Sequence, residues 1–111
     1  MQFDTFHELI KKRAATNPEW DYGIEKCRDE MTVAFCADIN ETIRFLDEGC
    51  TGEELIWLSE VFENIAARTQ SEEFIAAIKR TAAKYPVETE MYYIADNINY
   101  AECLVGEEDI R

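Results

Sequence analysis

Residues 17–49 read NPEWDYGIEKCRDEMTVAFCADINETIRFLDEG, and this stretch decides the fold class. Apolar side chains recur in it at spacings of three and four residues, which is the period of an α-helix. This apolar stripe consists of Trp20, Ile24, Cys27, Met31, Phe35, Ile39, Ile43 and Leu46. Asn17 before Pro18 is typical of an N-cap followed by proline at the first helical position. The pattern fits one long helix or two helices broken near Asp29, and both alternatives stay open.

The helical spacing continues toward the N-terminus. Phe3 and Asp4 resemble a hydrophobic staple residue and an N-cap. The helix expected from there to about Thr16 carries an apolar face of Phe6, Leu9, Ile10 and Ala14.

Toward the C-terminus the sequence predicts further helices. Thr51-Gly52-Glu53-Glu54 is a capping box, because the Glu54 side chain can reach back to the backbone of Thr51, and it opens a helix to about Thr69. Ser71 caps the next helix, whose apolar face consists of Phe74, Ile75, Ile78, Ala82 and Tyr85. Pro86 suits the start of a last helix, which ends at Gly106. The residues expected to face inward on it are Val87, Met91, Ile94, Ile98, Ala101 and Val105.

No segment alternates polar and apolar residues for long enough to form a strand. We therefore expect one all-α domain spanning residues 1–111. Short connections favour antiparallel neighbours, so the architecture should be a compact antiparallel bundle or a short stack of helical hairpins, with about five helices. Residues 106–111 are expected to fray.

The net charge of −13 is unevenly distributed. Residues 29–63 hold ten acids and one basic residue, which gives −9, and residues 85–111 hold seven acids and one basic residue, which gives −6. Such a chain should be repelled by nucleic acid and anionic membranes and attracted to basic proteins. The absence of a long apolar run and of a secretory signal predicts a soluble, cytoplasmic protein.

The sequence contains no recognisable catalytic or metal-binding motif, so we expect a protein that is not an enzyme and has no cofactor and no metal. The single histidine, His7, lies off the apolar stripe and is expected to be solvated or to have a capping role instead of a catalytic one. The four cysteines contain no C-x-x-C pair and have no histidine beside them. We interpret Cys27, Cys36, Cys50 and Cys103 as free thiols, with two disulfides in an exported protein as the alternative.

Helical geometry turns a second set of aromatic residues away from the core stripes. On the helix from Gly52, Trp57 is expected on an acidic outer face; the predicted partner-binding residues there are Glu53, Trp57, Glu60 and Asn64. On the last helix they are Tyr92, Tyr93, Asp96, Asn99 and Tyr100. Phe45 is expected to project near Asp38 and Glu41 instead of inward. Tyr and Trp are frequent anchors of protein interfaces, although a helix contacted on two sides would place Trp57 in the core.

The middle of the chain resembles the small helical immunity proteins of bacterial polymorphic-toxin systems, including contact-dependent growth inhibition. The resemblance covers about residues 51–104 and is carried by the runs 57–65 (WLSEVFENI), 69–75 (TQSEEFI), 84–86 (KYP) and 96–98 (DNI). It implies a cytosolic protein without enzymatic activity that binds a cognate toxin, often a basic nuclease, and blocks its active site. The alternative from the residues themselves is a regulatory adaptor or a homo-oligomeric scaffold.

Overall fold

Residues 3–106, described by a computed structural model, form eight α-helices and one 3-10 turn. They are α1 (Asp4–Ala15), α2 (Asp21–Ala37), α3 (Ile39–Glu48), α4 (Gly52–Leu58), the turn η1 (Ser59–Val61), α5 (Phe62–Thr69), α6 (Glu72–Lys84), α7 (Pro86–Met91) and α8 (Ile94–Leu104). The all-α prediction is confirmed for this range. Because α4, η1 and α5 follow without a break, the eight helices make seven helical units and not about five.

Two of the predicted helix starts are confirmed by their caps. The Thr51 hydroxyl accepts from the Glu54 amide at 3.1 Å, and the Glu54 carboxylate accepts from the Thr51 amide at 3.0 Å, which completes the capping box of α4. Ser71 accepts from the Phe74 amide at 3.0 Å and caps α6. Local side-chain chemistry therefore sets both boundaries.

The stretch 17–49, for which one helix or two helices broken near Asp29 stayed open, forms two helices with the break elsewhere. Asp29 lies inside α2, and the break is at Asp38, whose extended backbone separates α2 from α3. The Asp38 carboxylate accepts from the amides of Asn40 at 3.1 Å and Glu41 at 3.3 Å. The side chain thus satisfies amide groups at the start of α3 that have no partner within the helix.

The helix predicted from Pro86 to Gly106 is also interrupted. Tyr93 adopts a left-handed backbone conformation with φ of 55°, which ends α7 and precedes α8. This conformation is uncommon for a residue other than glycine, so the sequence pattern does not signal it. Phe3 likewise has a φ of 69° and occupies the cap position of α1, so Asp4 is the first helical residue and not the N-cap.

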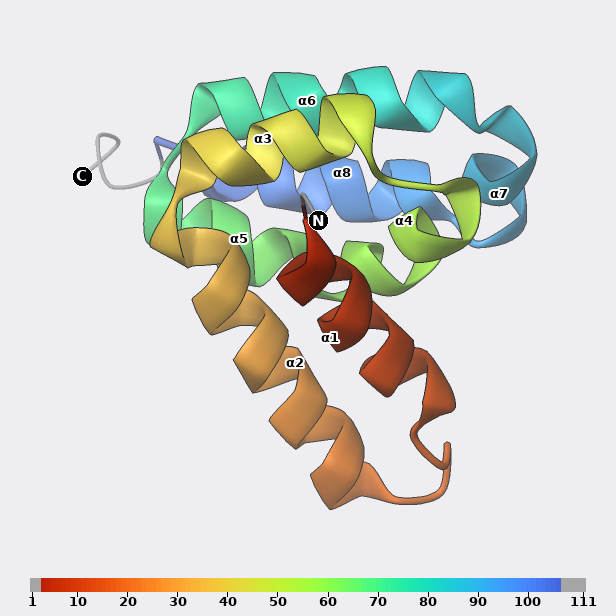
Figure 1. The fold of residues 1–111 in the computed structure, drawn as a ribbon. Helices are drawn as coiled ribbons and strands as arrows, with labels where there is room; N and C mark the ends of the chain where they lie inside the picture. The colour runs from red at the N-terminus through yellow and green to blue at the C-terminus, as the bar shows by residue number, and fades with distance from the viewer. Residues whose placement is uncertain (1–2, 107–111) are drawn as a thin grey trace.

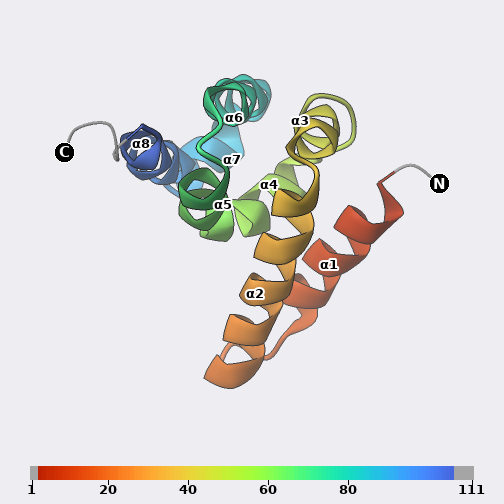
Figure 2. The same ribbon diagram turned by 90° about the vertical axis from the view of Figure 1, so that its left-hand side faces the viewer.

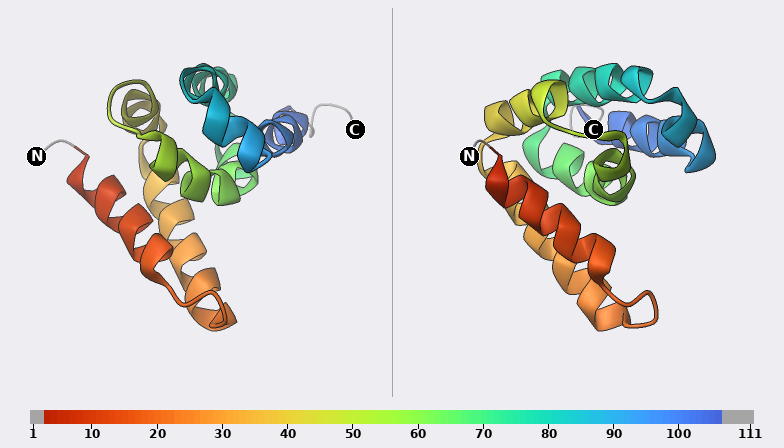
Figure 3. Two further views of the ribbon diagram at one scale, coloured as in Figure 1. Left: turned by 90° about the vertical axis from the view of Figure 1, so that its right-hand side faces the viewer. Right: turned by 45° about the vertical axis from the view of Figure 1, so that its right-hand side comes forward.

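The helices are arranged as hairpins around one core, in agreement with the predicted stack of hairpins. Figure 1 shows α3 running along α6, and α8 returning beneath α6, where it also packs against α5. The α1–α2 hairpin projects from these helices at an angle, as the views in Figures 2 and 3 also show. In Figure 2, α3, α5, α6 and α8 are seen nearly end-on, while α2 extends below them.

The core is contiguous and contains an aromatic cluster at the base of the α1–α2 hairpin. Phe45 is fully buried, and its ring lies 5.3 Å from that of Phe6 and 5.9 Å from that of Phe35, measured between centroids. The prediction that Phe45 projects outward is therefore wrong. The predicted stripe still faces inward on α3, since Ile39 and Ile43 pack against the core and Leu46 is fully buried, but the buried face of α3 is wider than the stripe and includes Phe45. The expected fraying of residues 107–111 lies outside the described residues.

Candidate functional site

The first group of predicted binding residues, on α4, η1 and α5, does not form one acidic outer face. Trp57 is half-buried and packs against the core. Glu60 lies toward α1 and α2, where Arg13 binds it with two hydrogen bonds, Nε to Oε1 at 2.7 Å and Nη2 to Oε2 at 2.8 Å. The reason is that other helices cover this face: α1 packs against α4, and α2 packs against η1.

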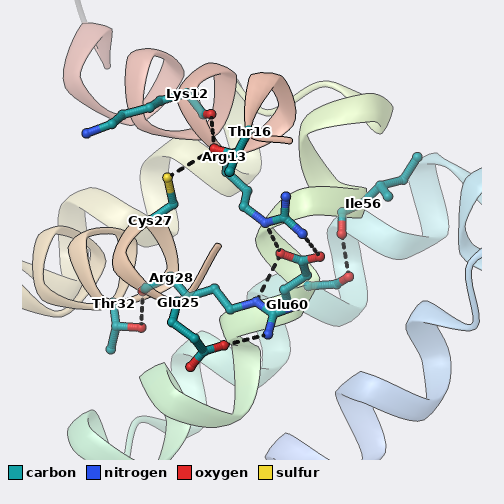
Figure 4. A network of polar contacts seen from close by, with 10 residues as sticks. Lys12, Arg13, Thr16, Glu25, Cys27, Arg28, Thr32, Ile56 and Glu60 are labelled. Carbon is teal, nitrogen blue, oxygen red and sulfur yellow. Dashed lines mark hydrogen bonds and ion pairs between the residues drawn. The ribbon is translucent and has the colours of Figure 1, made fainter. Parts of the chain in front are cut away.

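Arg13 is the centre of a polar network that the sequence did not reveal (Figure 4). Its side chain is only 7% exposed, and its guanidinium carbon lies 4.8 Å from the centre of the Trp57 ring. Arg28 of α2 also contacts the Glu60 carboxylate, at 3.4 Å, and pairs with Glu25 at 3.0 Å. The network joins both helices of the hairpin to α4 and η1. In the folded chain the Glu60 carboxylate is therefore occupied by internal partners.

The two other residues of the first group are exposed but lie apart. Glu53 lines a shallow groove of about 410 Å³ between α1 and α4, together with Trp57 and Lys11, while Asn64 lies on α5. His7 of α1 contacts the Glu54 carboxylate in the same groove. Glu54 thus caps α4 with one oxygen and contacts α1 with the other, while the His7 side chain remains 39% exposed.

The second predicted group, on α7 and α8, is exposed as expected. Tyr92 is 51% exposed, Tyr93 72% and Tyr100 59%. Asp96 and Asn99 are exposed as well. Asp96 and Tyr100 are four residues apart and lie on one side of α8, whereas Ile94, Ile98 and Ala101 on the opposite side are buried. Tyr93 directly precedes the helix. We name the residues Val87, Glu90, Met91, Tyr92, Tyr93, Asp96, Asn99 and Tyr100 the α7–α8 surface.

Two residues of this surface correct the sequence analysis. Val87 and Met91 were expected to face inward, and each is 65% exposed. The short helix α7 instead turns Glu88 and Thr89 toward the body, where Thr89 donates to the Ala82 carbonyl at 3.1 Å. The interruption at Tyr93 removes α7 from the register of α8, so its apolar residues become part of the outer surface.

The α7–α8 surface is acidic. The helices and their junction, residues 86–104, contain four acids and no lysine or arginine. Glu102 is paired with Lys79 of α6 at 2.7 Å, but within residues 3–106 no basic group pairs with Glu90 or Asp96. Exposed tyrosines and uncompensated carboxylates therefore occur together on one pair of helices.

Another exposed aromatic pair lies at the loop between α1 and α2 and was missed. Trp20 is 55% exposed and Tyr22 68% exposed. The sequence placed Trp20 in the buried stripe of 17–49, but α2 begins only at Asp21, so Trp20 lies before the helix and does not share its periodicity. The helix was predicted to begin at Pro18, but it begins three residues later, at Asp21.

The cysteine thiols in the described part of the chain are free, and two of them have a raised pKa. Burial raises the pKa of the Cys50 thiol to about 12, and it also raises the pKa of Cys36. A thiol with a raised pKa is a poor nucleophile at neutral pH. Within residues 3–106 all four cysteines are free, and no group of three or more potential metal ligands is assembled. Cys27, Cys36 and Cys50 are buried or half-buried, whereas Cys103 is exposed on α8.

Comparison with models of known protein families, with curated proteins and with solved structures found no match to this chain. None of the helices in the described part of the chain combines the length and the apolar character that crossing a bilayer requires.

Proposed function

We propose that this chain is a non-catalytic, cytoplasmic protein-binding module that attaches to a basic protein through the α7–α8 surface. The observation that carries the proposal is the exposure of Tyr92, Tyr93 and Tyr100 on or between the same two helices as Glu90 and Asp96, which have no basic partner within residues 3–106. Tyrosine buries a large area with few rotatable bonds and keeps a polar hydroxyl, so it binds at a low entropic cost. The carboxylates attract a basic partner over a distance and disfavour acidic proteins.

The resemblance of residues 51–104 to immunity proteins suggests the biological form of this interaction. In that form the partner is a cognate toxin, and the chain neutralises it by covering its active site. A toxin that acts on nucleic acid needs cationic side chains to bind phosphates, and this cationic surface is complementary to the α7–α8 surface. The proposal therefore combines the geometry of α7 and α8 with a resemblance that rests on sequence alone.

The alternative is an adaptor or a homo-oligomeric scaffold in which a second copy covers the same surface. The exposed side chains of Val87 and Met91 favour it, because they add apolar area that a protein interface would bury. However, a two-fold symmetric contact would place Glu90 and Asp96 close to the same residues of the other copy. Like charges across an interface are unfavourable, which favours a basic partner over a second copy. Sedimentation equilibrium of the pure protein separates a monomer from a dimer.

The experiment that tests the proposal is co-expression with the product of the neighbouring reading frame, followed by co-purification and a toxicity assay. In the resulting complex, Tyr93→Ala should weaken binding by about 2 kcal/mol, or roughly 30-fold, the range expected for a central aromatic anchor. The free energy of unfolding of the Tyr93→Ala protein alone should differ from that of the unchanged protein by less than about 0.5 kcal/mol, since Tyr93 is 72% exposed. Tyr100→Ala should behave in the same way.

Val33→Ala is the matched control, because Val33 is 61% exposed but lies on α2, away from α7 and α8. It should leave binding unchanged. The proposal is refuted if both tyrosine variants bind within about twofold of this control, a difference of only about 0.4 kcal/mol.

A further inference from the structure

The loop between α1 and α2 lies at the free end of the hairpin, far from the other helices (Figures 1 and 3). Two aromatic residues lie there, Trp20 at the end of the loop and Tyr22 in the first turn of α2. The rings of Trp20 and Tyr22 lie 6.0 Å apart between centroids, at an angle of 49°. Trp20 is 55% exposed and Tyr22 68% exposed. Neither belongs to the core cluster, so packing inside the described chain does not account for their size.

The position of Trp20 depends on Gly23. A Cβ atom at Gly23 would lie 2.2 Å from Cε3 of the Trp20 ring, which shows that the indole lies directly over the backbone of the first turn of α2. The loop itself is held by hydrogen bonds: the Trp20 amide donates to the Asn17 carbonyl at 3.0 Å, and the Glu19 amide donates to the Asn17 side chain at 2.8 Å. The indole is thus held in place before any partner binds, which lowers the entropic cost of binding.

The surroundings of this pair are acidic. Residues 17–26 contain three acids and one basic residue, Lys26, which is exposed one helical turn after Tyr22. Glu25 is paired with Arg28 at 3.0 Å, whereas Glu19 and Asp21, which flank Trp20 in the chain, have no basic partner within residues 3–106. Aromatic rings beside unpaired carboxylates favour a cation, because the ring faces and the carboxylates both attract positive charge.

We infer that the hairpin end, formed by Glu19, Trp20, Asp21, Tyr22 and Gly23, is a second contact surface that takes an arginine-rich segment of the basic partner. A guanidinium stacks on the Trp20 indole and pairs with a flanking carboxylate. Arginine suits this site better than lysine, because its planar group can stack on a ring and bind a carboxylate at the same time.

The same chain already contains this combination in its interior. The Arg13 guanidinium lies over the Trp57 ring at 4.8 Å and binds the Glu60 carboxylate through two hydrogen bonds. The hairpin end offers a ring and carboxylates of the same kind, but without an internal arginine. The inference rests on the proposed function only in taking the partner to be a basic protein, since the residues involved are separate from α7 and α8.

The test is an NMR titration of the full-length protein with hexa-arginine and, separately, with hexalysine. We expect hexa-arginine to shift the indole N–H signal of Trp20 and the amide signals of residues 19–23. Hexalysine should bind this site about fivefold more weakly, since the stacking contact of an exposed arginine contributes roughly that factor. Trp20→Ala should remove the difference between the two peptides.

Gly23→Ala tests the geometry without weakening the fold. The added methyl group must displace the exposed indole, while alanine is a better helix former than glycine. We expect normal or slightly higher stability together with loss of the preference for arginine. Val33→Ala should retain that preference, because Val33 lies on another part of α2.

The outcomes separate this inference from the proposed function. Shifts at Tyr93, Asp96 and Tyr100 without shifts at residues 19–23 overturn the hairpin-end site and leave the α7–α8 proposal standing. Shifts only at residues 19–23 support the hairpin-end site and count against α7–α8. Equal shifts with both peptides, or signals of Trp20 that change with protein concentration alone, overturn the arginine site. The latter result would mean that a second copy covers the hairpin end.

Discussion

Replacing Glu60 with alanine tests whether the Arg13 network fastens the α1–α2 hairpin to the rest of the molecule. In Glu60→Ala, Arg13 loses two hydrogen bonds of 2.7 and 2.8 Å and remains 7% exposed, so its charge is buried without a carboxylate. Removing one partner of a buried ion pair costs about 3–5 kcal/mol. Because the Glu60 side chain is still 22% exposed, we expect the lower end, about 3 kcal/mol.

Urea denaturation followed by circular dichroism measures this loss. With a slope of about 2 kcal/mol per molar urea, typical of a small domain, the midpoint should fall by roughly 1.5 M. Asp47→Ala is the matched control, because it breaks an ion pair with Arg80 in which the side chains are 36% and 52% exposed. An exposed pair contributes at most about 1 kcal/mol, so this control should change the midpoint by less than about 0.5 M.

A double variant identifies the source of the loss. Arg13→Met combined with Glu60→Leu removes both charges and keeps the volume, so it should regain most of the stability lost in Glu60→Ala. The reasoning is refuted if Glu60→Ala costs no more than Asp47→Ala. If Glu60→Ala instead weakens partner binding at unchanged stability, Glu60 is a binding residue, as its place in the sequence suggested.

Further predictions concern salt, capping and thiol chemistry. Association with a basic partner should slow as ionic strength rises from about 0.05 to about 0.5 M, and a rate that does not change in stopped-flow measurements would contradict electrostatic steering. Thr51→Ala should lower the free energy of unfolding by about 1 kcal/mol, because it removes the cap of α4, and an unchanged thermal midpoint would contradict this. Iodoacetamide at pH 8 should modify exposed Cys103 well before buried Cys50, as peptide mass spectrometry can show. The pKa of Cys50 is about 12 in the folded state and roughly 8.5 in the unfolded state. At a pH between these two values, Cys50 is protonated in the folded state and ionised in the unfolded state. Its contribution to stability should therefore fall as pH rises through that range, and Cys50→Ala should remove this part of the pH dependence.

Much of the fold can be predicted from the sequence because helices are stabilised by local interactions. The three- and four-residue spacing predicted helices throughout, and the caps at Thr51 and Ser71 lie where their hydrogen bonds require. Asp38 also carried a usable signal, since an aspartate before an apolar helical segment is a typical N-cap. The break at Tyr93 had no such signal, because a tyrosine rarely adopts a positive φ.

The candidate binding residues show the same division. The exposure of Tyr100 was predictable, because α8 has one buried side and its opposite side follows from helical geometry. Tyr93 is exposed as expected, but it precedes α8, so this geometry does not explain its exposure. Glu60 was misplaced, because its partner Arg13 lies 47 positions away in the chain, and a helical pattern does not reveal that α1 and α2 cover this face. Trp20 was misplaced because α2 begins only at Asp21, the residue after it, so the helix does not turn Trp20 inward.

The sequence by itself determined that the chain is helical, where several of its caps lie, and which segments are acidic. Each of these properties depends on residues within about four positions of one another, the reach of a helical hydrogen bond. Only the tertiary structure decided which faces are covered: it buried Phe45, joined Arg13 to Glu60 and left Val87, Met91 and Trp20 exposed. The physical reason is that a helical pattern identifies an apolar stripe, but which other helices pack against it depends on contacts between distant parts of the chain.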